Sequence, residues 1–227
     1  MTELLFPGRA RPTVPIVGLG AMFPVGRILC VGRNYAAHRR EMGGDERDPP
    51  FFFAKPGDAI VTGGAATPYP TATSDLHHEI ELVVAIGKAG QDVDAASALE
   101  LVFGYAVGVD LTRRDLQAIA KAKGQPWDAA KGFDHSAPIS DIQPWRGPPP
   151  AGRIRLSVNG VLRQEASLED MIWSVAEVIG EASRLWRLEA GDLIFTGTPE
   201  GVGPVARGDA LVGEIDAVGR LAFAIGG

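Results

Sequence analysis

The apolar residues of this chain fall mostly into short runs separated by glycine, proline and polar clusters, a pattern typical of β-strands. The predicted single strands cover residues 28–32, 51–55, 77–87, 103–110 and 192–195. Two hairpins are also expected, one at 154–164 around the turn-forming pair Asn159-Gly160 and one within 210–225. Fewer helices are predicted, at residues 35–42, 92–101 and 112–123 and, with Ser167 as the expected N-cap, from there to Trp186.

The predicted strand 77–87 carries two acidic residues at its start. Successive side chains of a strand point to opposite faces, so Glu79 and Glu81 share one face while Ile80 and Leu82 share the other. Carboxylates at the mouth of a strand that enters a core are costly unless a cation neutralises them. The alternative is an edge strand with a solvated acidic face.

Two other strand ends are candidate sites. Strand 103–110 ends in a carboxylate, Asp110, directly before a predicted helix. Strand 192–195 leads into the glycine-rich turn 196–203, whose backbone N–H groups and threonine hydroxyls could hold an anion. An ordinary tight turn is the alternative for the second of these.

The predicted helix 35–42 carries a histidine and a glutamate three residues apart. His38 and Glu41 therefore lie on the same helix face and can meet. A carboxylate that holds an imidazole fixes its tautomer and raises its basicity. The alternative is a solvated pair beside Arg39 and Arg40.

Composition limits the class of protein. With 227 residues and 45% hydrophobic content, the chain can bury one sizeable core. Residues 1–26, rich in proline and glycine, predict an extended arm, and residues 27–227 a single catalytic domain. The net charge of −6 and scattered basic residues argue against nucleic acid or a membrane surface as partner. Without an apolar run of membrane-spanning length, and with Cys30 as the only cysteine, a cytoplasmic protein without internal disulfides is expected.

Six motifs, in this order along the chain, together resemble one family. They are Gly32–His38, Phe53–Pro56, His78–Leu82, Gly108–Asp110, Lys131–Asp134 and Thr196–Gly203. Residues 27–227 are similar to the fumarylacetoacetate hydrolase family, and most closely to its short acylpyruvate hydrolases, which include the fumarylpyruvate hydrolases. The resemblance implies an α+β fold, a mixed β-sandwich roll with a few covering helices.

The resemblance also implies a divalent metal held by Glu79, Glu81 and Asp110. The residue types agree, because three carboxylates without cysteine or histidine form a hard oxygen site. Such a site suits Mg²⁺ or Mn²⁺, with Ca²⁺ as a further option, rather than zinc. Family members are commonly dimers, so a homodimer is expected.

The implied activity is metal-dependent hydrolysis of a carbon–carbon bond. The expected substrate is an acylpyruvate, a small 2,4-diketoacid, and specifically fumarylpyruvate. It is cleaved to pyruvate and a carboxylic acid during aromatic-compound degradation. By resemblance, His38 with Glu41 deprotonates water and Lys131 supports the developing oxyanion. The implied substrate-binding residues are Arg114, Gln117 and Thr198, with Arg33 and Lys55 as further contacts for a distal carboxylate.

Other activities of the same superfamily remain open alternatives. They include oxaloacetate decarboxylation, tautomerisation or isomerisation of 2-oxoacids, and hydration, because a fold does not determine the reaction. The presence of both His38 and Glu41 favours hydrolysis, which needs a base for water. A non-catalytic metal- or anion-binding protein is the alternative from another class.

Overall fold

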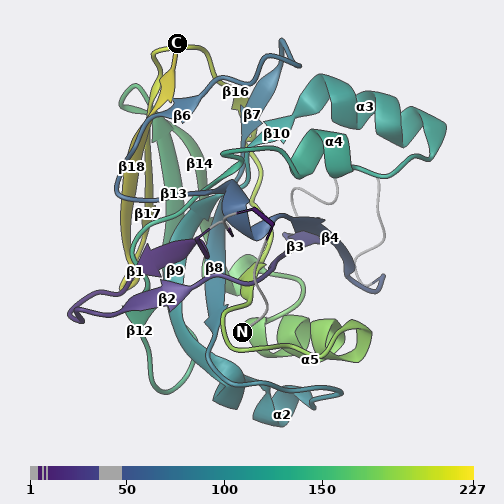
Figure 1. The fold of residues 1–227 in the computed structure, drawn as a ribbon, viewed down its shortest axis with the longest axis vertical. Helices are drawn as coiled ribbons and strands as arrows, with labels where there is room; N and C mark the ends of the chain where they lie inside the picture. The colour runs from purple at the N-terminus through teal and green to yellow at the C-terminus, as the bar shows by residue number, and fades with distance from the viewer. Residues whose placement is uncertain (1–4, 7, 9, 36–47) are drawn as a thin grey trace.

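The computed structural model describes residues 5–6, 8, 10–35 and 48–227, and two large β-sheets form its body (Figure 1). The first has six strands in the order β12-β9-β8-β15-β3-β4. Their bounds are Gln143–Pro144, Val102–Val109, Ile80–Ile86, Leu193–Phe195, Ile28–Gly32 and Phe51–Lys55. All neighbours are antiparallel except β15 and β3, which are parallel, so the sheet is mixed.

The second sheet has five strands in the order β14-β13-β17-β18-β6. Their bounds are Val161–Ser167, Arg153–Val158, Ala210–Ile215, Gly219–Gly226 and Thr67–Pro68. Two hairpins supply most of this sheet. The turn Asn159-Gly160 joins β13 to β14 with both residues at positive φ, as the sequence predicts.

Three small sheets complete the architecture. One consists of β10-β7-β16, another of β11-β5, and the third of the hairpin β1-β2. Their bounds, in that order, are Thr112–Arg113, Leu76–His78, Gly203–Pro204, Ala137–Pro138, Ile60–Val61, Thr13–Pro15 and Met22–Pro24.

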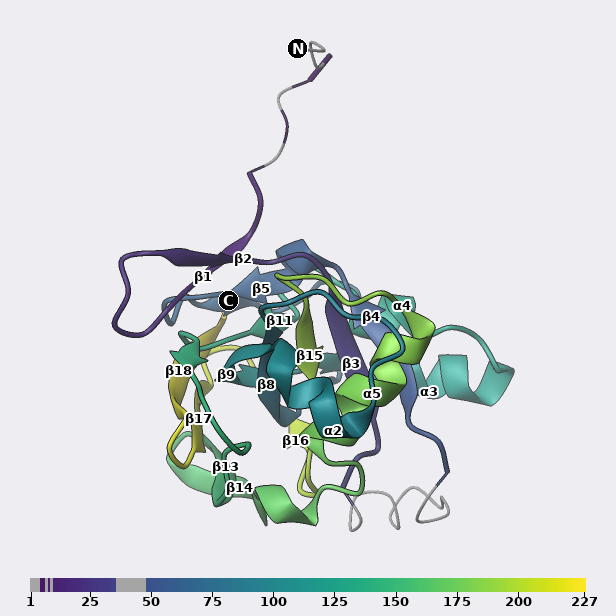
Figure 2. The same cartoon turned by 90° about the horizontal axis from the view of Figure 1, so that it is seen from below.

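The helices are short and lie outside the sheets (Figures 1 and 2). Those in the described residues are α2 (Ala95–Ala98), α3 (Arg114–Lys123), α4 (Asp128–Lys131) and α5 (Val175–Leu185), with 3₁₀ turns at Gly57–Ala59, Leu99–Leu101 and Leu168–Asp170. α2 packs against α5, whereas α3 and α4 pack together near β4 and β10. The predicted α+β class with few covering helices is confirmed.

Successive side chains of β8 point to opposite faces of the six-stranded sheet, and both faces are apolar. The even-numbered residues from Ile80 to Ile86 join the core between the two large sheets. There the sheets approach closely, because a Cβ on Gly213 of β17 would lie only 2.6 Å from Ile80 Cδ1. The odd-numbered Val83 and Ala85 join a second core, beneath the β1–β2 hairpin. The first face therefore joins the two large sheets, and the second receives the N-terminal hairpin.

The predicted extended arm is wrong for residues 13–25. β1 and β2 form a hairpin, and its Val14 and Phe23, with Val25 directly after it, are buried in the second core. Burial of three large apolar side chains outweighs the absence of a sustained hydrophobic period in this segment. The hairpin is thus part of the folded body.

The helix predicted from the N-cap Ser167 to Trp186 starts seven residues later than expected. Ser167 caps only the 3₁₀ turn Leu168–Asp170, and α5 begins at Val175. The stronger start is Ser174, which forms a capping box with Glu177. Two other helices match their predictions in part. The helix predicted at 112–123 is α3, which ends before Gly124 (φ +61°) as expected but begins at Arg114. The predicted helix 92–101 is split into α2 and a 3₁₀ turn.

The predicted helix 35–42 lies outside the described residues beyond Tyr35. Within the described part of the chain, no helix combines the length and apolar character needed to cross a membrane.

Candidate metal centre and active site

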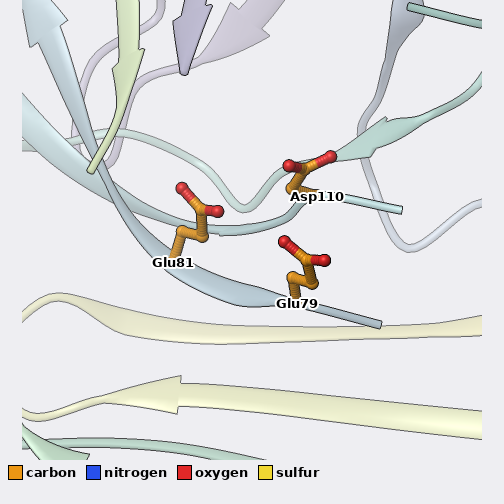
Figure 3. A group of neighbouring side chains, drawn as sticks. All are labelled: Glu79, Glu81 and Asp110. Carbon is orange, nitrogen blue, oxygen red and sulfur yellow. The ribbon is translucent and has the colours of Figure 1, made fainter. Parts of the chain in front are cut away.

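Three buried carboxylates meet at one end of the β8–β9 pair (Figure 3). Glu79 lies between β7 and β8, Glu81 lies in β8, and Asp110 follows β9. One carboxylate oxygen from each residue lies within 4.8 Å of those from the other two. All three side chains are buried, and β8 runs between β9 and β15. The alternative of an edge strand with a solvated acidic face is therefore wrong.

The strand register brings these residues together. In the antiparallel pair, Ile80 faces Val109 and Glu81 faces Gly108. The next position along each strand therefore places Asp110 beside Glu79, and the Asp110 N–H donates to the Glu79 carbonyl at 2.8 Å. The predicted strand 77–87 is interrupted at Glu79, because β7 leaves the large sheet and pairs with β10 and β16.

Lys131 at the end of α4 links two of the carboxylates. Its Nζ donates to Asp110 Oδ2 at 2.6 Å, to Glu79 Oε2 at 2.9 Å and to Thr112 Oγ1 at 2.6 Å. Burial acts to lower the pKa of Lys131, but the attraction of Asp110 and Glu79 outweighs it and raises that pKa above its ordinary value. Lys131 is therefore a permanent positive charge inside the site.

Two further cations contact the same carboxylates. Lys55 Nζ lies 2.8 Å from Asp110 Oδ1, is fully buried and also donates to the Leu111 carbonyl at 3.1 Å. Arg114 Nη2 lies 2.5 Å from Glu79 Oε1. Burial acts to raise the pKa of Glu79, yet Lys131 and Arg114 outweigh it and hold that pKa well below its usual range. Glu79 is therefore ionised.

Glu81 and Asp110 retain capacity for a cation. Glu81 Oε2 accepts a hydrogen bond from the Gly197 N–H at 2.7 Å, and burial, Asp110 and Glu79 raise its pKa. Asp110 Oδ1 accepts no hydrogen bond from the described residues, since Lys55 approaches it without hydrogen-bond geometry. Crowded, incompletely bonded carboxylate oxygens are what a hard divalent cation needs, so the donor set suits Mg²⁺ or Mn²⁺.

The glycine-rich turn does bind an acidic group, but that group is a side chain of the protein itself. Gly197, at φ +99°, directs its N–H at Glu81. A Cβ at this position would lie 2.7 Å from the Asn34 Cβ, so both the backbone angle and the available space require glycine. Asn34 in turn bonds the Thr196 carbonyl and the backbone of Trp173. The turn is held in place from two sides.

A cavity opens over Glu79 and Glu81, and most of the predicted substrate residues line it. Its lining includes Arg33, Arg114, Gln117, Lys131 and Thr198. The other described residues in its lining are Val31, Gly32, Phe51, Phe53, Glu79, Glu81, Lys121 and Trp127. Lys55 does not line it, because its ammonium lies below Asp110 among protein partners. The predicted dyad of His38 and Glu41 lies outside the described residues.

Sequence reasoning missed Gln164, which lies directly behind the site. Its side chain on β14 is buried and bonds four groups: the Thr198 hydroxyl, the Pro199 carbonyl, His78 Nδ1 and the Ile80 N–H. Gln164 thus ties the five-stranded sheet to the strand of the two glutamates. No local pattern could have found it, because every partner comes from another segment of the chain.

Lys121 was also missed, although a local signal exists. Arg114, Gln117 and Lys121 are spaced i, i+3 and i+7 along α3 and therefore lie on one helix face. All three line the cavity. The two predicted substrate residues of this helix thus point to the third.

Comparison with known proteins identifies the family of this chain. Residues 27–225 match the family model described as fumarylacetoacetate (FAA) hydrolase C-terminal. A fumarylpyruvate hydrolase from Ralstonia sp is 44% identical over 177 residues, which cover 78% of this chain and 92% of that protein. The mitochondrial oxaloacetate tautomerase of Mus musculus is 43% identical over 200 residues, 87% of this chain and 90% of that protein. Among solved structures, the fumarylpyruvate hydrolase of Pseudomonas aeruginosa in complex with Mn²⁺ and pyruvate is 50% identical, with a TM-score of 0.95 and 99% of each chain covered.

The mixed-sheet fold, the buried carboxylate centre and these relatives define an enzyme that hydrolyses carbon–carbon bonds. The chain belongs to the fumarylacetoacetate hydrolase family.

Proposed function

We propose that this enzyme is a metal-dependent acylpyruvate hydrolase that acts on fumarylpyruvate. The supporting observation is the buried Glu79, Glu81 and Asp110 centre under a cavity lined by Arg114 and Thr198. A relative with half of its residues identical was solved with Mn²⁺ and pyruvate. One of the two expected products of the reaction is thus a ligand of a close structural relative.

In this proposal Glu79, Glu81 and Asp110 hold a divalent cation, Mg²⁺ or Mn²⁺. When bound, the cation would supply concentrated positive charge that stabilises the pyruvate leaving group. Lys55 and Lys131 then have a supporting role, because both ammonium groups contact Asp110. We assign Lys55 to the support of Asp110 rather than to a direct substrate contact.

Thr198 and Arg114 are the residues we assign to the pyruvate end of the substrate. The Thr198 hydroxyl accepts a hydrogen bond from Gln164 Nε2 at 2.9 Å, which leaves its own proton free to be donated to a carboxylate. Arg114 is oriented by Glu79 and by Gln117 Oε1. A guanidinium fixed on both sides loses little freedom when it binds an anion.

The hydrolysis itself requires a base for water, and we assign it to His38 supported by Glu41. His38 removes a proton from water as the oxygen attacks the distal carbonyl carbon. The bond between that carbon and the methylene carbon then breaks, and its electron pair and a proton go to the methylene carbon of pyruvate. Lys131, held charged, lines the same cavity and can stabilise the negative charge that develops on the attacked carbonyl oxygen.

The test is to measure pyruvate release from fumarylpyruvate and acetylpyruvate with Mn²⁺ or Mg²⁺, before and after EDTA treatment. Both substrates should be cleaved, fumarylpyruvate with the higher kcat/KM, and EDTA should abolish activity until the metal is restored. Undiminished turnover by metal-free protein would contradict the proposal.

Oxaloacetate tautomerisation is a second candidate function, favoured by the mouse relative with 43% identity. It moves a proton between carbon 3 and the 2-oxo oxygen and breaks no carbon–carbon bond. The enol form of oxaloacetate absorbs in the ultraviolet, so the same preparation can be assayed for both reactions. Fast tautomerisation without pyruvate release from any acylpyruvate would favour this candidate.

The physiological setting is part of the same proposal. A fumarylpyruvate hydrolase would act in aromatic-compound degradation, and we expect a homodimer in the cytoplasm. The pathway and the dimer rest on the resemblance to the family, and the location rests on the composition of the chain. Gel filtration with light scattering measures the oligomeric state directly.

A further inference from the structure

One face of α3 carries a row of polar side chains that extends away from the carboxylate centre. Arg114 contacts Glu79, Gln117 contacts Arg114, and Lys121 lies one turn further along the helix. At a rise of about 1.5 Å per residue, Lys121 is roughly 10 Å along the helix axis from Arg114. All three line one cavity, so Lys121 marks the end of it that is remote from the bond-breaking centre.

The charges at the two ends of this cavity differ. At the end near the metal centre, Lys131 and Arg114 line the cavity and each contact a carboxylate. Arg33 and Lys121 line the cavity as well, yet neither forms an ion pair with a described residue. Burial, followed by the repulsion of Arg114 and Arg33, lowers the pKa of Lys121 to about 8. Because Arg33 and Lys121 have no such ion pair, the remote end carries positive charge without a counter-ion from the described part of the protein.

Aromatic rings hold these two cations. Lys121 Nζ lies 5.1 Å from the centroid of the Trp127 ring, and Arg33 Cζ lies 5.8 Å from that of Phe51. The two rings meet edge to face at a centroid distance of 5.2 Å. Such contacts orient a cation while leaving its hydrogen-bond donors free for an anion.

The backbone also supports this arrangement. A Cβ on Gly32 would lie 2.1 Å from the Phe51 ring, so the ring packs directly on the chain at a position that only glycine can fill. The next residue, Arg33, has a φ of +60°, which is rare for a residue with a side chain. Strained backbone of this kind is concentrated at ligand sites. The buried Nε of Arg33 has no hydrogen-bond partner among the described residues.

We propose that Lys121, together with Arg33, forms a second carboxylate subsite that selects acylpyruvates whose acyl group ends in a carboxylate. The proposal deepens the proposed function and rests on it. Fumarylpyruvate has carboxylates at opposite ends, so its pyruvate carboxylate would be held near Thr198 while its distal carboxylate reaches Lys121. Acetylpyruvate has no group for this subsite.

The experiment compares four Mn²⁺-loaded proteins: wild type, Lys121→Met, Lys121→Arg and, as a matched control on the same helix, Lys123→Met. Lys123 is exposed and does not line the cavity. Lys121→Met should lower kcat/KM for fumarylpyruvate by about 10- to 100-fold, mainly through KM, and should affect acetylpyruvate far less. Lys121→Arg should restore most of the loss, and Lys123→Met should behave as wild type.

An equal loss for both substrates in Lys121→Met, or no loss for either, would overturn the subsite. If wild type cleaves neither acylpyruvate, the proposed function fails, and calorimetry then tests the subsite by itself. Fumarate and crotonate share a four-carbon skeleton, but only fumarate has a second carboxylate. Wild type should bind fumarate more tightly, and Lys121→Met should lose that preference; equal binding of the two acids by wild type would overturn the subsite.

Discussion

Two buried polar clusters lie on opposite faces of the same chain segment, and they differ in how completely they are satisfied. On one face, the carboxylates of Glu79, Glu81 and Asp110 crowd together with Lys55 and Lys131. On the other, the neutral amide of Gln164 bonds this segment at His78 and Ile80 and a second one at Thr198 and Pro199. The amide uses all of its bonding capacity on the protein, whereas the carboxylates do not.

The difference teaches how to separate a functional cluster from a supporting one. A buried polar group whose partners are all protein atoms stabilises and orders the fold. A buried charge that leaves oxygens unbonded and repels its neighbours is stable only if something outside the chain completes it. Here the first kind holds the second in place, because Gln164 contacts both the Ile80 N–H and Thr198.

The largest expected effect comes from neutralising a carboxylate of the charged cluster. Glu81→Gln should abolish metal binding, measured by calorimetry with Mn²⁺, and with it the hydrolysis of acylpyruvates. The metal-free Glu81→Gln protein should nevertheless melt no lower than metal-free wild type, because the change removes repulsion from Asp110 and Glu79.

Asp110→Asn is the informative counterpart. It should also abolish metal binding, but it leaves Lys55 and Lys131 without their shared partner. Loss of one member of a buried ion pair costs about 3–5 kcal/mol. If denaturant unfolding showed the same stability for both variants, the described charge balance of the cluster would be wrong.

A smaller effect is expected from the proposed base. His38→Ala should lower kcat for acylpyruvate hydrolysis by ~10²–10⁴-fold and leave Mn²⁺ affinity unchanged, because a base for water is not a metal ligand. Glu41→Gln should cost less, since the imidazole remains. Near wild-type hydrolysis by His38→Ala would instead support a solvated surface pair and remove the base from the proposal.

The neutral cluster should respond more mildly. Gln164→Ala removes the partner of the Thr198 hydroxyl and of the Ile80 N–H, so both stability and substrate binding should suffer. We expect roughly 2–4 kcal/mol less stability and about a tenfold higher KM, with kcat changed less. Gln164→Glu can still accept hydrogen bonds from the Ile80 N–H and His78 but cannot donate to Thr198. It therefore separates the support of β8 from the support of Thr198. A kcat collapse at unchanged KM would show that Gln164 acts in the chemical step.

The smallest effect is expected at an ion pair outside both clusters. Arg27 Nη2 lies 2.5 Å from Asp192 Oδ2, but the Arg27 side chain is 42% exposed. Solvent screens such a pair, and Asp192 keeps hydrogen bonds from the Arg27 and Glu189 backbone N–H groups. Arg27→Met should therefore cost about 1 kcal/mol or less and leave kcat/KM unchanged. A large loss of activity would mean that incomplete hydrogen bonding of buried polar groups does not identify the functional site.

Features that depend on neighbouring residues could be predicted from the sequence. Strand alternation places Glu79 and Glu81 on one face, and the structure brings them together with Asp110. The hairpin turn at Asn159-Gly160 and the end of α3 at Gly124 follow from local backbone preferences. The six linked motifs predicted the family, which the comparisons confirm.

Features that depend on contacts between distant segments were decided only by the tertiary structure. Burial of the β1–β2 hairpin and the break between β7 and β8 each reflect a packing surface from another part of the chain. The same holds for the ammonium of Lys55 beneath Asp110 and for the four contacts of Gln164. Local sequence determines which face of an element a side chain occupies, but the energy of a buried charge or amide depends on the partners that folding brings to it.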